Sequence, residues 1–165
     1  MIAKENNYAF IDSQNLNLGT RSDGWILDFK KFRYFLKDKY HVTMAYLFIG
    51  YVSGNETLYR ILQEDGYICI FKPTLELADG TVKGNVDAEL VLHTMIEFEN
   101  FDRAVIVSGD GDFYCLIDHL LQKEKLKKML IPNSKRYSGL LKSLSTPENN
   151  IFHFLRDFKL KLGKK

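Results

Sequence analysis

The sequence predicts an α/β protein with a mostly parallel central sheet covered by helices on both faces. Short apolar runs alternate with amphipathic segments along the whole chain, an order typical of parallel strands joined by crossover helices. The length of 165 residues argues for one domain. The composition, 45% hydrophobic and 27% charged, is that of an ordinary globular protein.

The first half of the chain supplies three expected strands. Apolar residues at helical spacing predict a helix over residues 28–40. A second helix should follow an N-cap at Asn55, with Leu58, Ile61 and Leu62 as its buried stripe. The strands are short apolar runs at residues 8–12, 42–49 and 67–71.

The connections and the second half complete the pattern. The segment after the first strand, up to residue 27, is expected to be a loop, and the Asp79-Gly80 pair predicts a hairpin flap over residues 75–82. We divide the chain into a domain over residues 1–155 and a basic C-terminal tail over residues 156–165. The remaining helices are expected at 87–99, 112–122 and 137–144, and the strands at 103–108, 128–131 and 150–154.

The sequence shows no targeting signal, and its two cysteines are typical of a reducing compartment. No apolar run approaches the roughly 18 residues of a membrane span, and no basic-then-apolar leader begins the chain. We therefore expect a cytoplasmic protein without a membrane partner. Cys69 and Cys115 each lie in an apolar run and are expected to be buried free thiols.

Four aspartates fall where a parallel sheet gathers its functional residues. Asp12 follows the first strand, Asp110 and Asp112 follow the strand at 103–108, and Asp87 begins a helix. Carboxyl ends of parallel strands and the starts of the following helices share one edge of the sheet. Convergent carboxylates repel unless a cation neutralises them, and oxygen ligands suit Mg²⁺ or Mn²⁺. Each aspartate alone is also compatible with a capping or turn role.

Three segments resemble the NYN domains of the LabA-like group, within the PIN-like nuclease superfamily. The resemblance covers the chain from about Tyr8 to Leu155, and its segments stand in the family's order. They are residues 10–16 (FIDSQNL), 83–90 (KGNVDAEL) and 105–113 (VIVSGDGDF). The resemblance implies a PIN-like α/β/α fold, Mg²⁺ or Mn²⁺ as cofactor, and hydrolysis of RNA phosphodiester bonds.

Site residues follow from the same resemblance, position by position. The four aspartates match the family's acidic site, with Asn15 and Ser108 in supporting roles. One position departs from the family: many relatives carry a further Asp six residues after Asp87, where this chain has His93. Imidazole at the site would favour Mn²⁺ over Mg²⁺, whereas a packing or surface role leaves the choice of metal open.

The basic residues are distributed unevenly. Residues 123–165 carry 12 Lys and Arg against 3 Asp and Glu, whereas the first 122 carry 11 and 18. Lys83, Lys135 and Arg136 are candidates for RNA phosphate contacts, as are Lys142 and the terminal lysines. Trp25 and Tyr51 suit either base stacking or core packing. The expected partner is single-stranded RNA, and the sequence is also compatible with a homodimer.

Other functional classes share parts of this pattern. A haloacid-dehalogenase phosphatase requires a second Asp at the position of Gln14, which excludes that class. A Toprim-type enzyme shares the Asp-x-Asp pair but expects Glu in place of Asp12. A catalytically weak RNA-binding or regulatory module that retains the metal pocket is the alternative from a different class, and cleavage of labelled RNA with Mn²⁺ separates it from a nuclease.

Overall fold

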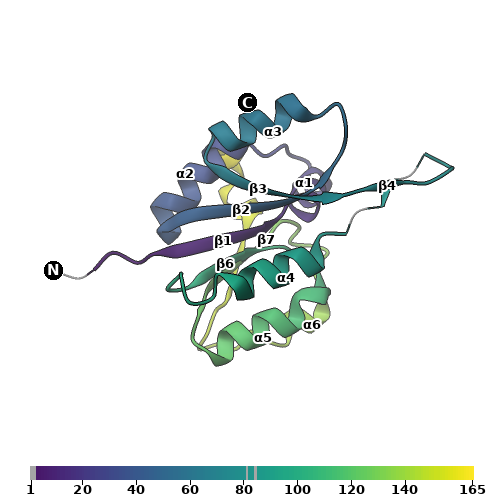
Figure 1. Ribbon diagram of the computed structural model, residues 1–165. Helices are drawn as coiled ribbons and strands as arrows, with labels where there is room; N and C mark the ends of the chain where they lie inside the picture. The colour runs from purple at the N-terminus through teal and green to yellow at the C-terminus, as the bar shows by residue number, and fades with distance from the viewer. Residues whose placement is uncertain (1–2, 81, 84) are drawn as a thin grey trace.

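The computed structural model describes residues 3–80, 82–83 and 85–165. Its centre is a six-stranded, wholly parallel sheet in the order β3-β2-β1-β6-β7-β8 (Figure 1). This confirms the predicted sheet, including the edge strand near the end of the chain. The strands are β1 (Asn7–Asp12), β2 (Val42–Tyr51), β3 (Tyr67–Pro73), β6 (Ala104–Val107), β7 (Leu126–Ile131) and β8 (Phe152–Phe154).

Helices cover both faces of the sheet, which confirms the three-layer α/β/α arrangement. Alternate residues of β1 enter different cores: Ala9 and Ile11 pack against one helix layer, and Tyr8 and Phe10 against the other. The first layer holds α1 (Ser13–Ser22), α2 (Phe29–Tyr40), α3 (Glu56–Glu64) and α7 (Lys159–Leu162); the second holds α4 (Asp87–Ile96), α5 (Tyr114–Gln122) and α6 (Gly139–Lys142). The described residues also form two 3₁₀ turns, η1 (Gly111–Phe113) and η2 (Leu155–Phe158).

The topology places two functional strands side by side. The strand β1 pairs with β2 on one side and with β6 on the other, and Ile11 lies beside Val107. Strand order reverses at this point, because the first three strands proceed one way and β6 begins the other half. Side chains that follow β1 and β6 therefore lie at one crevice, as a parallel sheet predicts.

The expected loop after the first strand is wrong, since residues 13–22 form α1 without any intervening loop. Its sequence, SQNLNLGTRS, is mostly polar and has poor helix propensity. The helix is nevertheless formed because Asp12 caps it and because Leu16, Gly19 and Thr20 are buried against the rest of the protein.

Two burial predictions also fail. Leu58 and Ile61 are 47% and 45% exposed, whereas Leu62 is buried as predicted and Tyr59 is buried beside it. The Tyr59 ring lies 4.8 Å from that of Phe71, measured between centroids, and its hydroxyl accepts a hydrogen bond from the Val52 N–H. A polar tip on an apolar ring made Tyr59 an unobvious core residue.

Other expected burial differs residue by residue. Cys115 is exposed and Cys69 half-buried, and both are free thiols. Trp25 is buried in the core, which removes it as a base-stacking candidate, whereas Tyr51 is 39% exposed.

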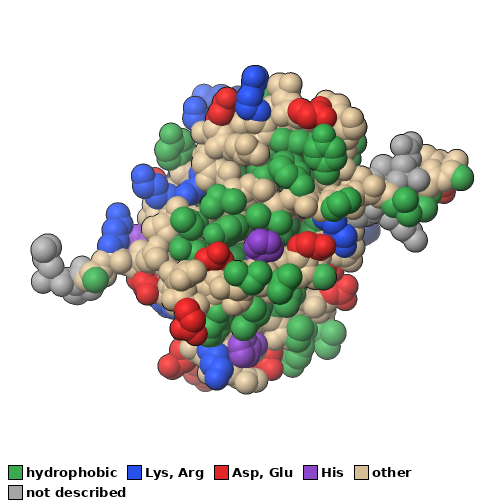
Figure 2. Space-filling view, viewed as in Figure 1, with side chains coloured by type: hydrophobic (Ala, Val, Ile, Leu, Met, Phe, Trp, Pro, Cys, Tyr) green, Lys and Arg blue, Asp and Glu red, His purple; other side chains and the backbone are tan. Residues whose placement is uncertain are grey.

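Figure 2 shows apolar side chains gathered on the face that carries α4, where Leu92, Met95 and Ile96 are exposed. No helix of the described residues is long and apolar enough to cross a membrane.

The flap is confirmed as an antiparallel hairpin of β4 (Leu75–Glu76) and β5 (Val82–Lys83), and it projects from the body (Figure 1).

The last ten residues, expected as a basic tail, pack against α2. Leu162 is fully buried, its carbonyl accepts a hydrogen bond from the Asp28 N–H, and Lys31 donates to the Gly163 carbonyl.

Candidate metal centre

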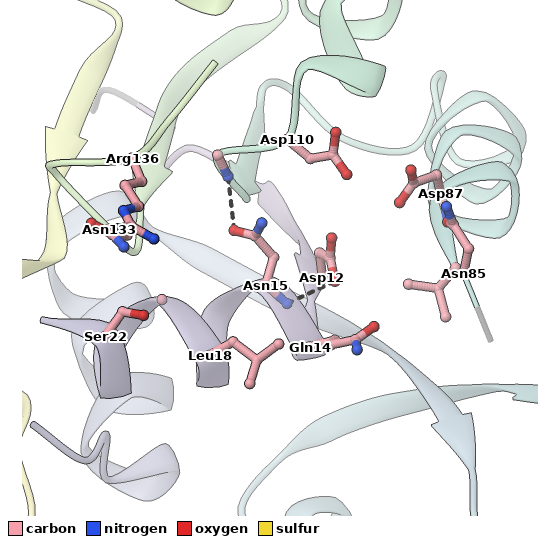
Figure 3. Close-up of a pocket in the computed structure, with 13 residues that line it drawn as sticks. Asp12, Gln14, Asn15, Leu18, Ser22, Asn85, Asp87, Asp110, Asn133 and Arg136 are labelled. Carbon is pink, nitrogen blue, oxygen red and sulfur yellow. Dashed lines mark hydrogen bonds between the residues drawn. The ribbon is translucent and has the colours of Figure 1, made fainter. Parts of the chain in front are cut away.

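Asp12 occupies the junction of β1 and α1 and serves both. Its Oδ1 accepts a hydrogen bond from the Asn15 N–H at 3.1 Å, which caps the helix, and its Oδ2 accepts from the Ser108 hydroxyl at 3.4 Å. The residue is only 5% exposed. The capping role that the sequence left open is thus real, and the second oxygen still faces the crevice beyond the strands (Figure 3).

The loop after β6 brings Asp110 to the same place. The buried Ser108 hydroxyl accepts a hydrogen bond from the Asp110 N–H at 3.1 Å while donating to Asp12. The Asn15 side chain accepts one from the Gly109 N–H at 2.9 Å. Through these hydrogen bonds, Asn15 and Ser108 connect the loop after β6 to Asp12 and to α1.

Asp87 arrives from the flap at the first turn of α4. Its N–H donates to the Asn85 side chain at 2.7 Å. Lys72, at the end of β3, donates to the Asn85 carbonyl and lies 3.5 Å from the Glu89 carboxylate. The start of α4 is therefore held against the carboxyl edge of the sheet by contacts on both sides of Asp87.

The three aspartates form one cluster, in which an oxygen from each lies within 4.8 Å of the others. The Asp87 Oδ2 is buried and receives no hydrogen bond from the described residues. Burial, followed by the charge of Asp110, raises the pKa of Asp87 to about 6. Burial also raises the pKa of Asp12, even though the Asn15 amide and Ser108 hydroxyl act in the opposite direction.

The cluster fits a hard divalent cation. An orphaned buried carboxylate oxygen and raised pKa values are what a site of unbalanced negative charge produces. The donors are oxygens alone, the set that Mg²⁺ and Mn²⁺ prefer and zinc does not. Asp12, Asp87 and Asp110 are therefore the residues that would hold such an ion.

Asp112 and His93 lie outside this cluster. Asp112 is exposed, donates its N–H to the Asp110 Oδ1 at 2.9 Å, and neighbours Asp87 without joining the three-carboxylate group. The His93 ring packs against Phe48, with 5.5 Å between centroids, and near Tyr46. The histidine is thus a packing residue, so it favours neither Mn²⁺ nor Mg²⁺.

A cavity of about 470 Å³ opens above the carboxylates. Arg136 lines it, whereas Lys135 is exposed outside it, and the side chain of Lys83 lies outside the described residues. Sequence reasoning missed four polar residues of the lining: Gln14, Ser22, Asn85 and Asn133 (Figure 3). Asn133 follows β7 at the same edge of the sheet, so the carboxyl-edge rule that found Asp110 would also have found it.

Glycines around the cavity serve close packing. A Cβ on Gly111 would lie 2.4 Å from the Ser138 Oγ, and one on Gly19 would lie 2.5 Å from the Pro132 Cβ. The backbone of Gly111 does not adopt a positive φ, so its conformation alone does not require glycine. It is therefore required for the approach of the α6 N-cap to the Asp110 loop.

Comparison with known proteins defines the class. The NYN domain family matches residues 8–143, and the chain belongs to this family, which implies a place among PIN-like nucleases.

Two known proteins are similar to this chain over most of its length. LabA of Synechococcus elongatus, the low amplitude and bright protein, is 26% identical over 125 residues, which cover 70% of this chain and 67% of LabA. A crystal structure of a protein of unknown function from Vibrio parahaemolyticus matches with a TM-score of 0.73 and 25% identity, over 94% of this chain and 96% of that one.

Proposed function

We propose that the protein is a Mg²⁺- or Mn²⁺-dependent ribonuclease that hydrolyses phosphodiester bonds of single-stranded RNA. The observation that carries the proposal is the placing of Asp12, Asp87 and Asp110 within 4.8 Å of one another in an open cavity. Membership of the NYN family supports a nuclease. The coarser class rests on that membership, and the RNA substrate and the metal are our extension of it.

Each aspartate has a role that follows from its hydrogen bonds. Hydrogen bonds fix Asp12 and Asp110 through one oxygen of each, which accepts from the Asn15 and the Asp112 N–H. The other Asp12 oxygen accepts from the Ser108 hydroxyl, and the remaining carboxylate oxygens of Asp12 and Asp110 would serve as ligands of a bound ion. Asp87, with an oxygen that receives no hydrogen bond from the described residues, would be the third ligand and would also orient an attacking water. A bound divalent ion supplies Lewis-acid stabilisation of the phosphoryl oxygens and a lowered water pKa.

Phosphate binding falls to the cavity wall opposite the carboxylates. Arg136 carries the fork of donors that suits a phosphate. Asn133 and Ser22 offer neutral donors beside it. A polyanionic strand is thereby kept near the cluster without base-specific contacts from these groups, as expected for phosphate contacts.

Metal binding and cleavage test the proposal together. We expect Mn²⁺ to raise the melting temperature relative to EDTA, because the ion relieves carboxylate repulsion in the folded state. A labelled single-stranded RNA should be cleaved in Mg²⁺ or Mn²⁺ and remain intact in EDTA. Asp110→Asn, which keeps the capping oxygen, is the matched control and should lose both effects. Absence of cleavage with every divalent ion would reject the nuclease.

A binding or regulatory module is the second candidate. It is favoured by His93, which is half-buried against the Phe48 ring at a position where many relatives carry an Asp, and by the exposure of Asp112. The cluster therefore has three carboxylates where the resemblance implied four or five. A melting temperature raised by Mn²⁺, together with RNA binding and no cleavage, would identify the module.

A further inference from the structure

A second cavity adjoins the carboxylate cavity across helix α1. It measures about 330 Å³, in the range of small-ligand pockets. Both cavities share Gln14, Leu18 and Val86 as walls. Asp12 lines the first cavity, and the next residue, Ser13, lines the second, so the two cavities lie on either side of the start of α1.

Helix geometry explains the division. Gln14 and Leu18 lie four residues apart and form the ridge between the cavities. Asn15 and Gly19 face the carboxylates, whereas Ser13 and Asn17 face the second cavity. Leu18 is 56% exposed, so the top of the ridge is an apolar surface that a ligand can cross.

The chemistry of the two linings differs. Three aspartates and Arg136 line the first cavity, whereas no charged side chain of the described residues lines the second. Its walls are apolar side chains and neutral amides or hydroxyls. Leu58 and Val52 are exposed in it at 47% and 38%. The Asn55 side chain makes no capping hydrogen bond to its helix, so its amide can pair with a ligand.

We propose that this second cavity binds an unpaired base of the RNA strand whose phosphate lies at Asp12, Asp87 and Asp110. The inference rests on the proposed function. A nucleobase is a flat, neutral group with donors and acceptors on its edge, which matches apolar walls and free amides. A phosphate would instead require the charge found only in the first cavity. A paired base cannot enter, so the cavity makes the site selective for single strands.

Leu58 and Ile61 provide a matched pair for the test. They lie on the same helix with nearly equal exposure, and only Leu58 lines the cavity. The probes are a fluorescent single-stranded RNA, an abasic oligomer of the same length, and a duplex of the same sequence. Binding is measured by anisotropy in EDTA, so that it does not depend on cleavage, and rates are measured separately in Mn²⁺.

We expect Leu58→Asn to weaken binding of the base-containing strand by about fivefold to tenfold, near the lower end of measured base-contact effects. The abasic oligomer and the duplex should change by less than about twofold, given that neither presents a free base. Ile61→Asn should change none of the three. Asn55→Ala tests the polar wall independently and should also act only on the base-containing strand.

Each failure has its own meaning. Equal effects of Leu58→Asn on all three probes, or no effect on any, would overturn the base site. So would equal binding of the base-containing and abasic strands by the unaltered protein. Loss of the base site with RNA cleavage intact would leave the nuclease proposal standing. Selective weakening without cleavage in any divalent ion would retain the base site and reject the nuclease.

Discussion

Carboxylates at the two ends of the sheet lie in opposite electrostatic environments. At the amino edge, Glu5 lies 2.8 Å from the Lys127 ammonium, accepts from the Asn7 amide and pairs with Arg103, and these contacts lower its pKa to about 2 despite partial burial. At the carboxyl edge, Asp87 meets Asp12 and Asp110, and its pKa is raised to about 6. The carboxylate at the amino edge is neutralised by cations, whereas the carboxylates at the carboxyl edge are not.

This difference separates stability from function. A balanced carboxylate contributes to folding and leaves little charge for a ligand. A cluster of like charges costs folding free energy and is retained where something binds. Because both kinds of site lie on one sheet, variants at the two edges serve as controls for each other.

The largest contrast should be in catalysis. Asp110→Asn removes one ligand charge while keeping the oxygen that accepts from the Asp112 N–H. We expect cleavage of RNA in Mn²⁺ to fall on the order of 100-fold or more, as with loss of other electrostatic stabilisers. Glu5→Gln should leave the rate unchanged. A nuclease rate that survives Asp110→Asn would mean that the cluster is not the catalytic centre.

Stability without metal should change in opposite directions at the two edges. Asp87→Asn removes a repelling charge and should raise the free energy of unfolding in EDTA by about 1–2 kcal/mol at neutral pH, after allowance for solvent screening. Glu5→Gln breaks a partly exposed ion-pair network and should lower it by roughly 1 kcal/mol. Urea denaturation measures both. If the two variants shift stability in the same direction, the contrast between the edges is wrong.

The pH dependence of unfolding should also run in opposite directions. The folded-state pKa of Asp87 is raised, so its favourable contribution is present below its ordinary value of 3.8 and is lost as pH rises to about 6. The folded-state pKa of Glu5 is lowered, so its contribution is present above 4.5 and is lost as pH falls toward 2. Urea midpoints of Asp87→Asn and Glu5→Gln in EDTA should therefore diverge from the unaltered protein in these separate windows.

The carboxyl-edge rule explains how much of the site could be predicted. Asp12 and Asp110 directly follow buried apolar strands, so topology alone places them together. Asp87 begins a helix reached through the flap, and its position also depends on Lys72 and Asn85, contacts that no local pattern encodes. Asp112 stands only two residues after Asp110, but it lies within the 3₁₀ turn η1 and remains exposed beside Asp87, outside the three-carboxylate cluster.

The same reasoning applies to the fold. Strands buried on both faces read as apolar runs, which is why the sheet was predictable. The polar α1 was not, since it is stabilised by a cap and by packing against distant residues such as Pro132. The burial of Leu162 was unpredictable for the same reason. Its neighbours in the sequence are lysines, which suggest a solvated segment, whereas packing against α2 buries it in the fold.

The smallest effect concerns the basic residues, which the fold divides between the two edges. Arg136 lines the carboxylate cavity, whereas Lys127 and Lys128 contact Glu5 and the Asn150 carbonyl at the amino edge. If RNA crosses only the carboxyl edge, Arg136→Gln should weaken RNA binding and reduce the slope of log affinity against log salt by about 0.7, the value for one phosphate on a single strand. Lys128→Gln is the matched charge removal and should leave the slope unchanged. Point substitutions are required here, because truncation of the terminal lysines would also remove the buried Leu162. An equal loss of slope in both variants would mean that RNA also contacts the amino edge, and it would contradict the assignment of RNA binding to the carboxyl edge alone.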